Sequence, residues 1–111
     1  MERIYNKLVR DNIPNIIKKN KGKAYTRILN NEEYKIELEK KLCEEYNEVI
    51  NAIDSNDRIE ELADMLEVIC SLAKLENKSL DDVIEVARLK REKRGGFQNK
   101  IFLEKVIEKD K

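Results

Sequence analysis

The chain has 111 residues, of which 41% are charged, and its 23 basic side chains balance its 23 acidic ones. This length is typical of a single domain spanning residues 1–111, and zero net charge argues against a general nucleic-acid binder, which carries a basic excess. The absence of histidine excludes a Ser-His-Asp triad, a histidine-bound zinc and any imidazole acid or base.

The first thirty residues carry weak local signals. Residues 4–9 form a short apolar stretch whose conformation the pattern leaves open. Asp11 is suited to cap a short helix with Pro14 in its first turn, and residues 20–22 would end it. Residues 23–29 (KAYTRIL) look extended or loop-like, with room for one short strand.

Two long helices follow. Apolar residues recur at three- and four-residue spacing over residues 31–53, which predicts the first of them. Asp57 is suited to cap the second, with Glu60 three residues on as a capping-box partner. We therefore expect the second long helix at residues 58–76.

The C-terminal third predicts two more helices. Ser79 is suited to cap a helix over residues 80–94, which Gly95 and Gly96 stop. The apolar residues of 98–108 are expected to dock as a short helix. Helix-rich chains with short loops form bundles, so the fold class is all-α, an antiparallel helical bundle.

The second long helix is apolar on nearly all sides. One stripe and a second apolar face lie more than about 90° apart on a helical projection; they comprise Leu62, Leu66, Ile69 and Ala73, and Val68, Leu72 and Leu75. A chain this small cannot surround such a helix alone, so we expect a homo-oligomer. Glu61 and Asp64 lie in register with the second apolar face, where surface charge is not expected.

Cellular context is read from what the chain lacks. No stretch approaches the roughly 18 apolar residues of a membrane span, and the N-terminus MERIYNKLVRDN is too polar for a signal peptide. We expect a cytosolic protein with no membrane partner. Cys43 and Cys70 lie in apolar helical contexts, and we expect both as buried reduced thiols rather than a disulfide.

Two acidic clusters carry the strongest chemical signal. The first lies in KLCEEYNEVI and the second in EELADMLEVI; their members are Glu44, Glu45, Glu48, Glu61 and Asp64. Twelve residues separate the clusters, which lets one helix end, turn and bring the next back alongside it. Converging carboxylates require cations or water, and an oxygen-only ligand set suits Mg²⁺ or Mn²⁺. Glu44, beside the set, is a candidate for holding a second ion or accepting a proton from attacking water.

Basic residues supply candidate phosphate ligands. Five of the seven residues at 88–94 are basic, and Lys90 and Arg94, one turn apart, are placed to grip a triphosphate; a solvated helix end favoured by the dipole is the alternative. Lys41 lies one turn before Glu45. Lys7 and Arg10 in NKLVRDN are further candidates without an assigned mechanism.

The spacing EExxE, twelve residues, then ExxD resembles the MazG-type all-α nucleotide pyrophosphohydrolases. The segments YNKLVRDNIPNII and KREKRGGFQNKIFLEKV resemble a single-domain branch described as phosphoribosyl-ATP pyrophosphatase-like. The resemblance implies hydrolysis between the α- and β-phosphates of a nucleoside triphosphate, Mg²⁺ dependence, and a dimer or tetramer of helical bundles. It implies metal ligands at Glu45, Glu48, Glu61 and Asp64, with Glu44 assisting, and phosphate contacts at Lys90 and Arg94.

Several functions remain open at this level. Phosphoribosyl-ATP hydrolysis is one alternative, but the motifs that resemble this branch do not specify its substrate. A nucleotide house-cleaning role is therefore favoured. A non-catalytic helical interaction module would use the apolar helix faces. An RNA-binding role for the basic run at 88–94 conflicts with the zero net charge.

Overall fold

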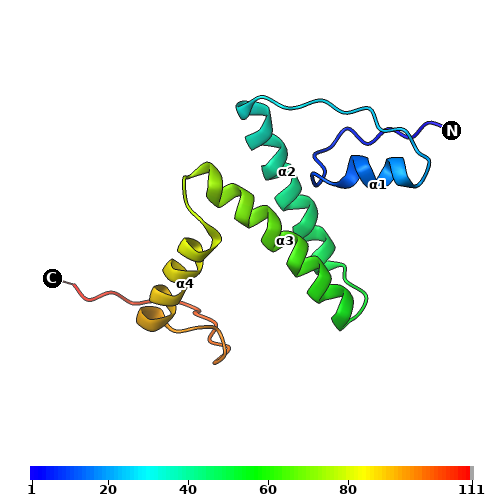
Figure 1. The fold of residues 1–111 in the computed structure, drawn as a ribbon. Coiled ribbons are helices and arrows are strands. Elements are labelled where there is room, and N and C mark those ends of the chain that lie inside the picture. Colours follow the sequence, from blue (N-terminus) through cyan, green and yellow to red (C-terminus); the bar gives the residue numbers. More distant parts are fainter. Residues whose placement is uncertain (111) are drawn as a thin grey trace. The chain divides into compact units, whose positions relative to one another are not determined.

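The computed structural model describes residues 1–110, and within them the chain is all-α, as predicted. Four helices follow in order: α1 (Ile13–Lys19), α2 (Asn31–Ile50), α3 (Ser55–Leu75) and α4 (Leu80–Arg94) (Figure 1). The chain divides into two units, the first ending at Leu80 and the second beginning at Asp81. The prediction of a single domain over 1–111 stays a prediction.

The short helix α1 forms with Pro14 in its first turn, where the missing N–H has no intrahelical partner to lose. The predicted cap, Asp11, is wrong: Asn12 occupies the N-cap position, and its side chain makes no capping hydrogen bond. After the helix, the N–H of Gly22 donates to the carbonyl of Ile17 at 2.9 Å. A Cβ at Gly22 would lie 2.8 Å from the Ile17 side chain, so this close turn requires glycine.

The helix α2 begins with a capping box that the sequence analysis did not identify. The Asn30 side chain accepts from the backbone N–H of Glu33, and the Glu33 side chain accepts from the backbone N–H of Asn30. Residues 23–29 reach this cap without helix or strand, so the extended or loop-like prediction is confirmed and the short strand is not formed. The helix ends at Ile50, three residues before the predicted end.

The start of α3 differs from the prediction. Asp54, not Asp57, is the N-cap, and its carboxylate accepts from the backbone N–H of Asp57 at 2.8 Å. Asp57 reaches back instead to accept from the N–H of Ile53 at 3.1 Å. The capping box expected between Asp57 and Glu60 is therefore wrong, because Asp57 already lies in the third helical position.

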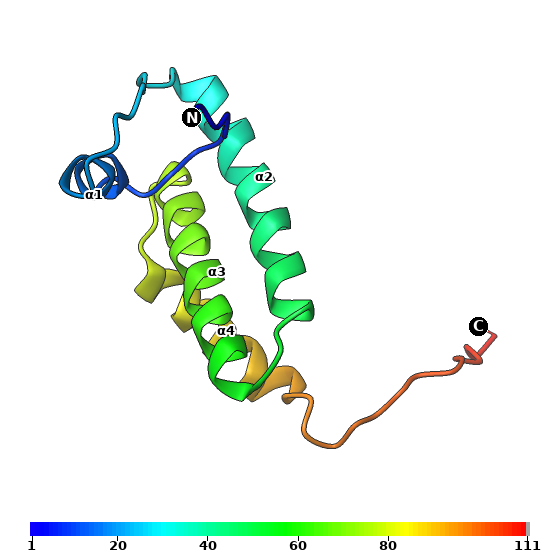
Figure 2. The same ribbon diagram turned by 90° about the vertical axis from the view of Figure 1, so that its right-hand side faces the viewer.

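Helices α2 and α3 pack against each other as an antiparallel pair (Figures 1 and 2). Leu38 of α2 and Val68 of α3 are buried, which is expected where apolar faces meet. On the other stripe of α3, Leu62 and Leu66 stay exposed in the single chain and keep 44% and 47% of their surface, whereas Ala73 at its C-terminal end is buried. Val68 belongs to the second apolar face, so Glu61 and Asp64, which lie in register with that face, are on the side of α3 that includes a buried residue.

In the second unit, α4 has the predicted bounds, and Gly95 follows it with a φ of 85°, a left-handed value that favours glycine. The predicted short helix at 98–108 is wrong. The chain forms no regular helix there, and Ile101, Phe102 and Ile107 are exposed. A single short helix is marginal in water unless its apolar face packs.

Both cysteines are free, so the absence of a disulfide between them is as predicted. Their predicted burial is wrong for Cys43, which is exposed, while Cys70 is half-buried. Cys43 falls outside the face of α2 that includes Leu38. Within residues 1–110, no helix combines the length and the apolar character that crossing a membrane requires.

Candidate metal centre

The acidic cluster begins with Glu45 on α2. Glu45 lies two turns after the buried Leu38, on the same face of the helix, and only 8% of its surface is exposed. It is the carboxylate that α2 buries. Burying a carboxylate is costly unless a cation or hydrogen bonds compensate.

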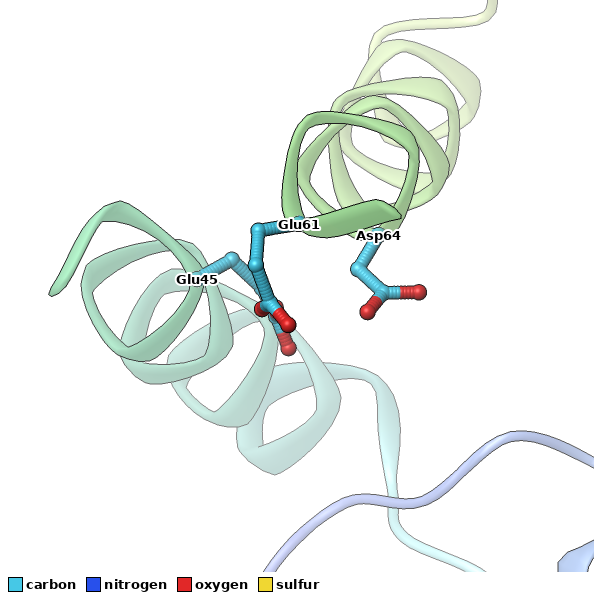
Figure 3. A group of neighbouring side chains, drawn as sticks. All are labelled: Glu45, Glu61 and Asp64. Atoms are coloured by element: carbon cyan, nitrogen blue, oxygen red, sulfur yellow. The ribbon is translucent and has the colours of Figure 1, made fainter. Parts of the chain in front are cut away.

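The partners of Glu45 come from α3. Glu61 and Asp64 are three residues apart, so their side chains leave the same side of the helix, and both are half-buried. Figure 3 shows the carboxylates of Glu45, Glu61 and Asp64 gathered where the two helices pass each other. We call these three residues the acidic trio.

One oxygen from each carboxylate of the acidic trio lies within 4.8 Å of the others. Oxygens on opposite sides of a Mg²⁺ ion are about 4 Å apart, because each Mg–O bond is about 2.1 Å long. Small side-chain rotations therefore suffice for all three oxygens to contact one ion. The donor set is entirely carboxylate oxygen, which suits hard cations such as Mg²⁺ and Mn²⁺.

Electrostatics at Glu45 favour a bound cation. Burial raises the pKa of Glu45, and the negative charge of Asp64 raises it further, with smaller contributions from Glu44 and Glu48. Lys41 opposes this shift in pKa, with its Nζ 4.0 Å from the Glu45 carboxylate. A divalent cation would offset both the cost of burying the Glu45 charge and its repulsion by neighbouring carboxylates.

Glu61 experiences the same effect from more neighbours. Partial burial raises its pKa first, followed by the charges of Glu48 and Asp57, then those of Asp64 and Glu45. Glu48, a predicted metal ligand, is exposed and lies outside the acidic trio. Its effect on the pKa of Glu61 shows that its charge acts on the cluster, but its role as a ligand stays a prediction.

Two lysines meet at Glu44, the predicted proton acceptor. Lys7 and Lys41 each place Nζ 3.4 Å from the Oε1 atom of Glu44. Lys41 thus lies between Glu44 and Glu45, as its position one turn earlier on α2 suggested. Glu44 is half-exposed and lies beside the acidic trio rather than in it.

The N-terminal segment supplies the cations for which sequence reasoning had no mechanism. Arg10 Nη2 lies 2.7 Å from Oδ1 of Asp64, a member of the acidic trio. Lys7 reaches Glu44 from the same segment. These contacts join residues 54 and 37 positions apart, so no local periodicity reveals them; the only signal was basic residues in a polar block.

The other predicted phosphate ligands belong to the second unit. Lys90 and Arg94 are exposed and one turn apart on α4, as expected, and their contact with substrate stays a prediction. Arg88 on the same helix forms ion pairs with Glu85 and Glu92: its Nη2 lies 2.7 Å from Oε1 of Glu85, and its Nη1 lies 2.6 Å from Oε1 of Glu92.

The fold and the cluster together define an all-α domain in which carboxylate oxygens converge from two packed helices, a donor set that suits a divalent cation. Residues 34–97 match the MazG nucleotide pyrophosphohydrolase domain, and the chain belongs to this family. The match covers the acidic trio and Glu48, and it begins after the N-terminal segment. No curated protein and no solved structure matches the chain significantly.

Proposed function

We propose that the chain is a Mg²⁺-dependent pyrophosphohydrolase that cleaves the α–β phosphate bond of a (deoxy)nucleoside triphosphate. The products are a nucleoside monophosphate and pyrophosphate, and the proposed role is nucleotide house-cleaning. The observation that carries the proposal is the convergence of Glu45, Glu61 and Asp64 within 4.8 Å in a chain of the MazG family.

The acidic trio is proposed to hold Mg²⁺, for which Mn²⁺ would substitute, with Glu48 as a further ligand. A divalent ion at this position supplies positive charge that neutralises phosphate oxygens and acidifies water. The protein's own contribution is to fix three carboxylates from two helices before the substrate arrives, so that little reorganisation is needed during reaction.

Glu44 is proposed to accept the proton of the attacking water. Its carboxylate is oriented by Lys7 and Lys41, which both contact Oε1. Lys41 is proposed to contact phosphate as well. Lys90 and Arg94 of α4 are proposed to stabilise the negative charge that develops on the pyrophosphate leaving group.

The exposed face of α3 supports self-association. A shallow apolar groove on this helix is lined by Ile59, Leu62, Ala63, Met65, Leu66 and Ile69. Exposed apolar surface of this kind is typical of a contact with another chain, and we propose a homodimer or homotetramer. Light scattering on the purified protein measures the mass of the assembly directly.

The function is tested by incubating the protein with Mg²⁺ and a panel of canonical, deoxy and modified nucleoside triphosphates, with phosphoribosyl-ATP as a separate arm. We expect pyrophosphate as the direct product. Glu45→Gln and Asp64→Asn should reduce the rate by about a hundredfold or more, as expected when a group acting on transition-state charge is removed. Glu39→Gln, an exposed change on the same helix, is the matched control.

Orthophosphate as the sole direct product would contradict α–β cleavage. Full activity in folded Glu45→Gln and Asp64→Asn would refute the metal assignment. Turnover confined to phosphoribosyl-ATP would replace house-cleaning with a biosynthetic role. An absence of both turnover and Mg²⁺-dependent thermal stabilisation would favour a non-catalytic interaction module.

A further inference from the structure

The segment before α1 is folded onto the α2–α3 pair by two ion pairs. Figure 2 shows residues 1–12 passing beside these helices on the way to α1. Lys7 contacts Glu44 on α2, and Arg10 contacts Asp64 on α3. The backbone turns at Asn6, whose φ of 46° is a left-handed value that asparagine tolerates better than most residues.

The ion pairs of this segment are poorly suited to a purely structural role. Arg10 keeps 56% of its side-chain surface exposed and Asp64 keeps 44%, and exposed pairs contribute little to stability. In the described part of the chain, Arg10 meets its carboxylate through one nitrogen, whereas Arg27 contacts both oxygens of Glu33. A guanidinium has five N–H donors, so Arg10 retains capacity for a second oxyanion.

The position of Arg10 creates a competition. Asp64 is a member of the acidic trio, so an ion bound there and the guanidinium of Arg10 both draw on the same carboxylate. A divalent ion weakens the hold of Asp64 on Arg10, because it neutralises the carboxylate charge. Arg10 is then left beside the metal centre with its donors available, and a guanidinium matches phosphate geometry better than any other side chain.

We propose that Arg10, assisted by Lys7, binds phosphate oxygens of the nucleotide, and that Asp64 holds Arg10 in place until the divalent ion binds. This proposal rests on the proposed function, because it takes the triphosphate as the ligand of the same site. It assigns the N-terminal segment a role in substrate binding, although that segment lies outside residues 34–97, the part of the chain that matches the MazG domain. Lys7 contributes less, since its partner Glu44 lies outside the acidic trio.

The proposal predicts two effects of opposite sign in Arg10→Gln. Without any phosphate ligand, Mn²⁺ should bind several-fold more tightly than to the wild type, because Asp64 no longer has a competing cation. With the divalent ion saturating, inorganic triphosphate should bind about tenfold or more weakly, the loss expected for one charge-assisted contact. Mn²⁺ binding is followed by electron paramagnetic resonance and triphosphate binding by calorimetry, so neither readout depends on turnover.

Arg3→Gln is the matched control. It removes an arginine from the same segment, whose contact is with Tyr5 at 3.5 Å rather than with the acidic trio, and both affinities should stay at wild-type values. Arg10→Lys keeps the charge without the planar fork and should recover part of the triphosphate affinity. Circular dichroism verifies that each variant is folded.

The outcomes separate this proposal from the proposed function. Unchanged triphosphate affinity in folded Arg10→Gln, or weaker Mn²⁺ binding, would overturn the assignment and leave Arg10 as a structural residue. Equal losses in Arg3→Gln would also overturn it, because they would reflect net charge alone. If Arg10→Gln shows both opposite effects while the wild-type protein hydrolyses no nucleotide, the proposed function is refuted and the phosphate-binding role of Arg10 is not.

Discussion

Two regions of the molecule are rich in charge and balance it in different ways. On α4, Arg88 contacts Glu85 and Glu92, and the hydrogen bond from Arg88 lowers the pKa of Glu85. At the acidic trio, burial and neighbouring carboxylates raise the pKa of Glu45 and Glu61. The charges of Arg88, Glu85 and Glu92 satisfy one another, whereas the charges of the trio repel and favour an added cation. The sign of the pKa shift, rather than the number of acidic residues, distinguishes the two regions.

The largest contrast should appear in metal binding. At a Mn²⁺ concentration one hundred times its Kd, the free energy of unfolding should increase by about 2.7 kcal/mol. Asp64→Asn should lose most of this gain, because it removes one of the three converging carboxylates. Glu85→Gln should keep all of it. Urea unfolding with and without Mn²⁺ measures the difference, and equal gains in the two variants would remove the distinction between the regions.

A smaller effect is expected from pH in the metal-free protein. Since folding raises the pKa of Glu45, the folded state binds protons more tightly than the unfolded chain, so the free energy of unfolding falls as pH rises. The fall should begin near the ordinary carboxyl value, about 4.3, and end above the raised pKa. Glu85 acts oppositely: its lowered pKa gives stability above the ordinary value that is lost as the solution is acidified.

Urea unfolding in EDTA at a series of pH values tests this contrast. Glu45→Gln should flatten the decline in stability above pH 4.3 or so, and Glu85→Gln should not. A wild-type curve that rises through this range, with no difference in Glu45→Gln, would show that the environment of Glu45 does not penalise its charge.

The smallest effect is expected for Arg88→Gln. Its contacts are exposed pairs one helical turn apart, and such pairs contribute little to stability. Thermal unfolding should change only slightly, and Mn²⁺ affinity should not change. A large loss of stability in Arg88→Gln would mean that α4 depends on this cluster in a way that exposed pairs do not explain.

The long helices were predictable because their apolar spacing is regular, but their ends were not. Residues 54–57 are Asp, Ser, Asn and Asp, four consecutive residues that are all suited to an N-cap. Propensity alone does not choose among them; the structure selects Asp54, and Asp57 then accepts from Ile53. The segment at 98–108 shows the opposite limit: helical spacing without a packed face does not produce a helix.

The acidic members of the site were predictable from spacing, since Glu61 and Asp64 interrupt an apolar face and the intervening length allows a return helix. The burial of Glu45 required knowledge of how closely the two helices pass. The contact between Arg10 and Asp64 was beyond local reasoning, because the two residues are 54 positions apart and depend on where the chain folds back.

The connection between α2 and α3 has a consequence for how this protein tolerates change. Only residues 51–54 join Ile50 to Ser55, and Asp54 both closes the loop and starts the next helix. The loop length therefore sets the register of the helix pair and decides which carboxylate of α2 faces Glu61 and Asp64. One inserted residue here would turn α3 by about 100° or slide it along its partner, with every side chain intact. The length of this loop therefore determines the geometry of the site, although none of its residues contributes an oxygen to the acidic trio.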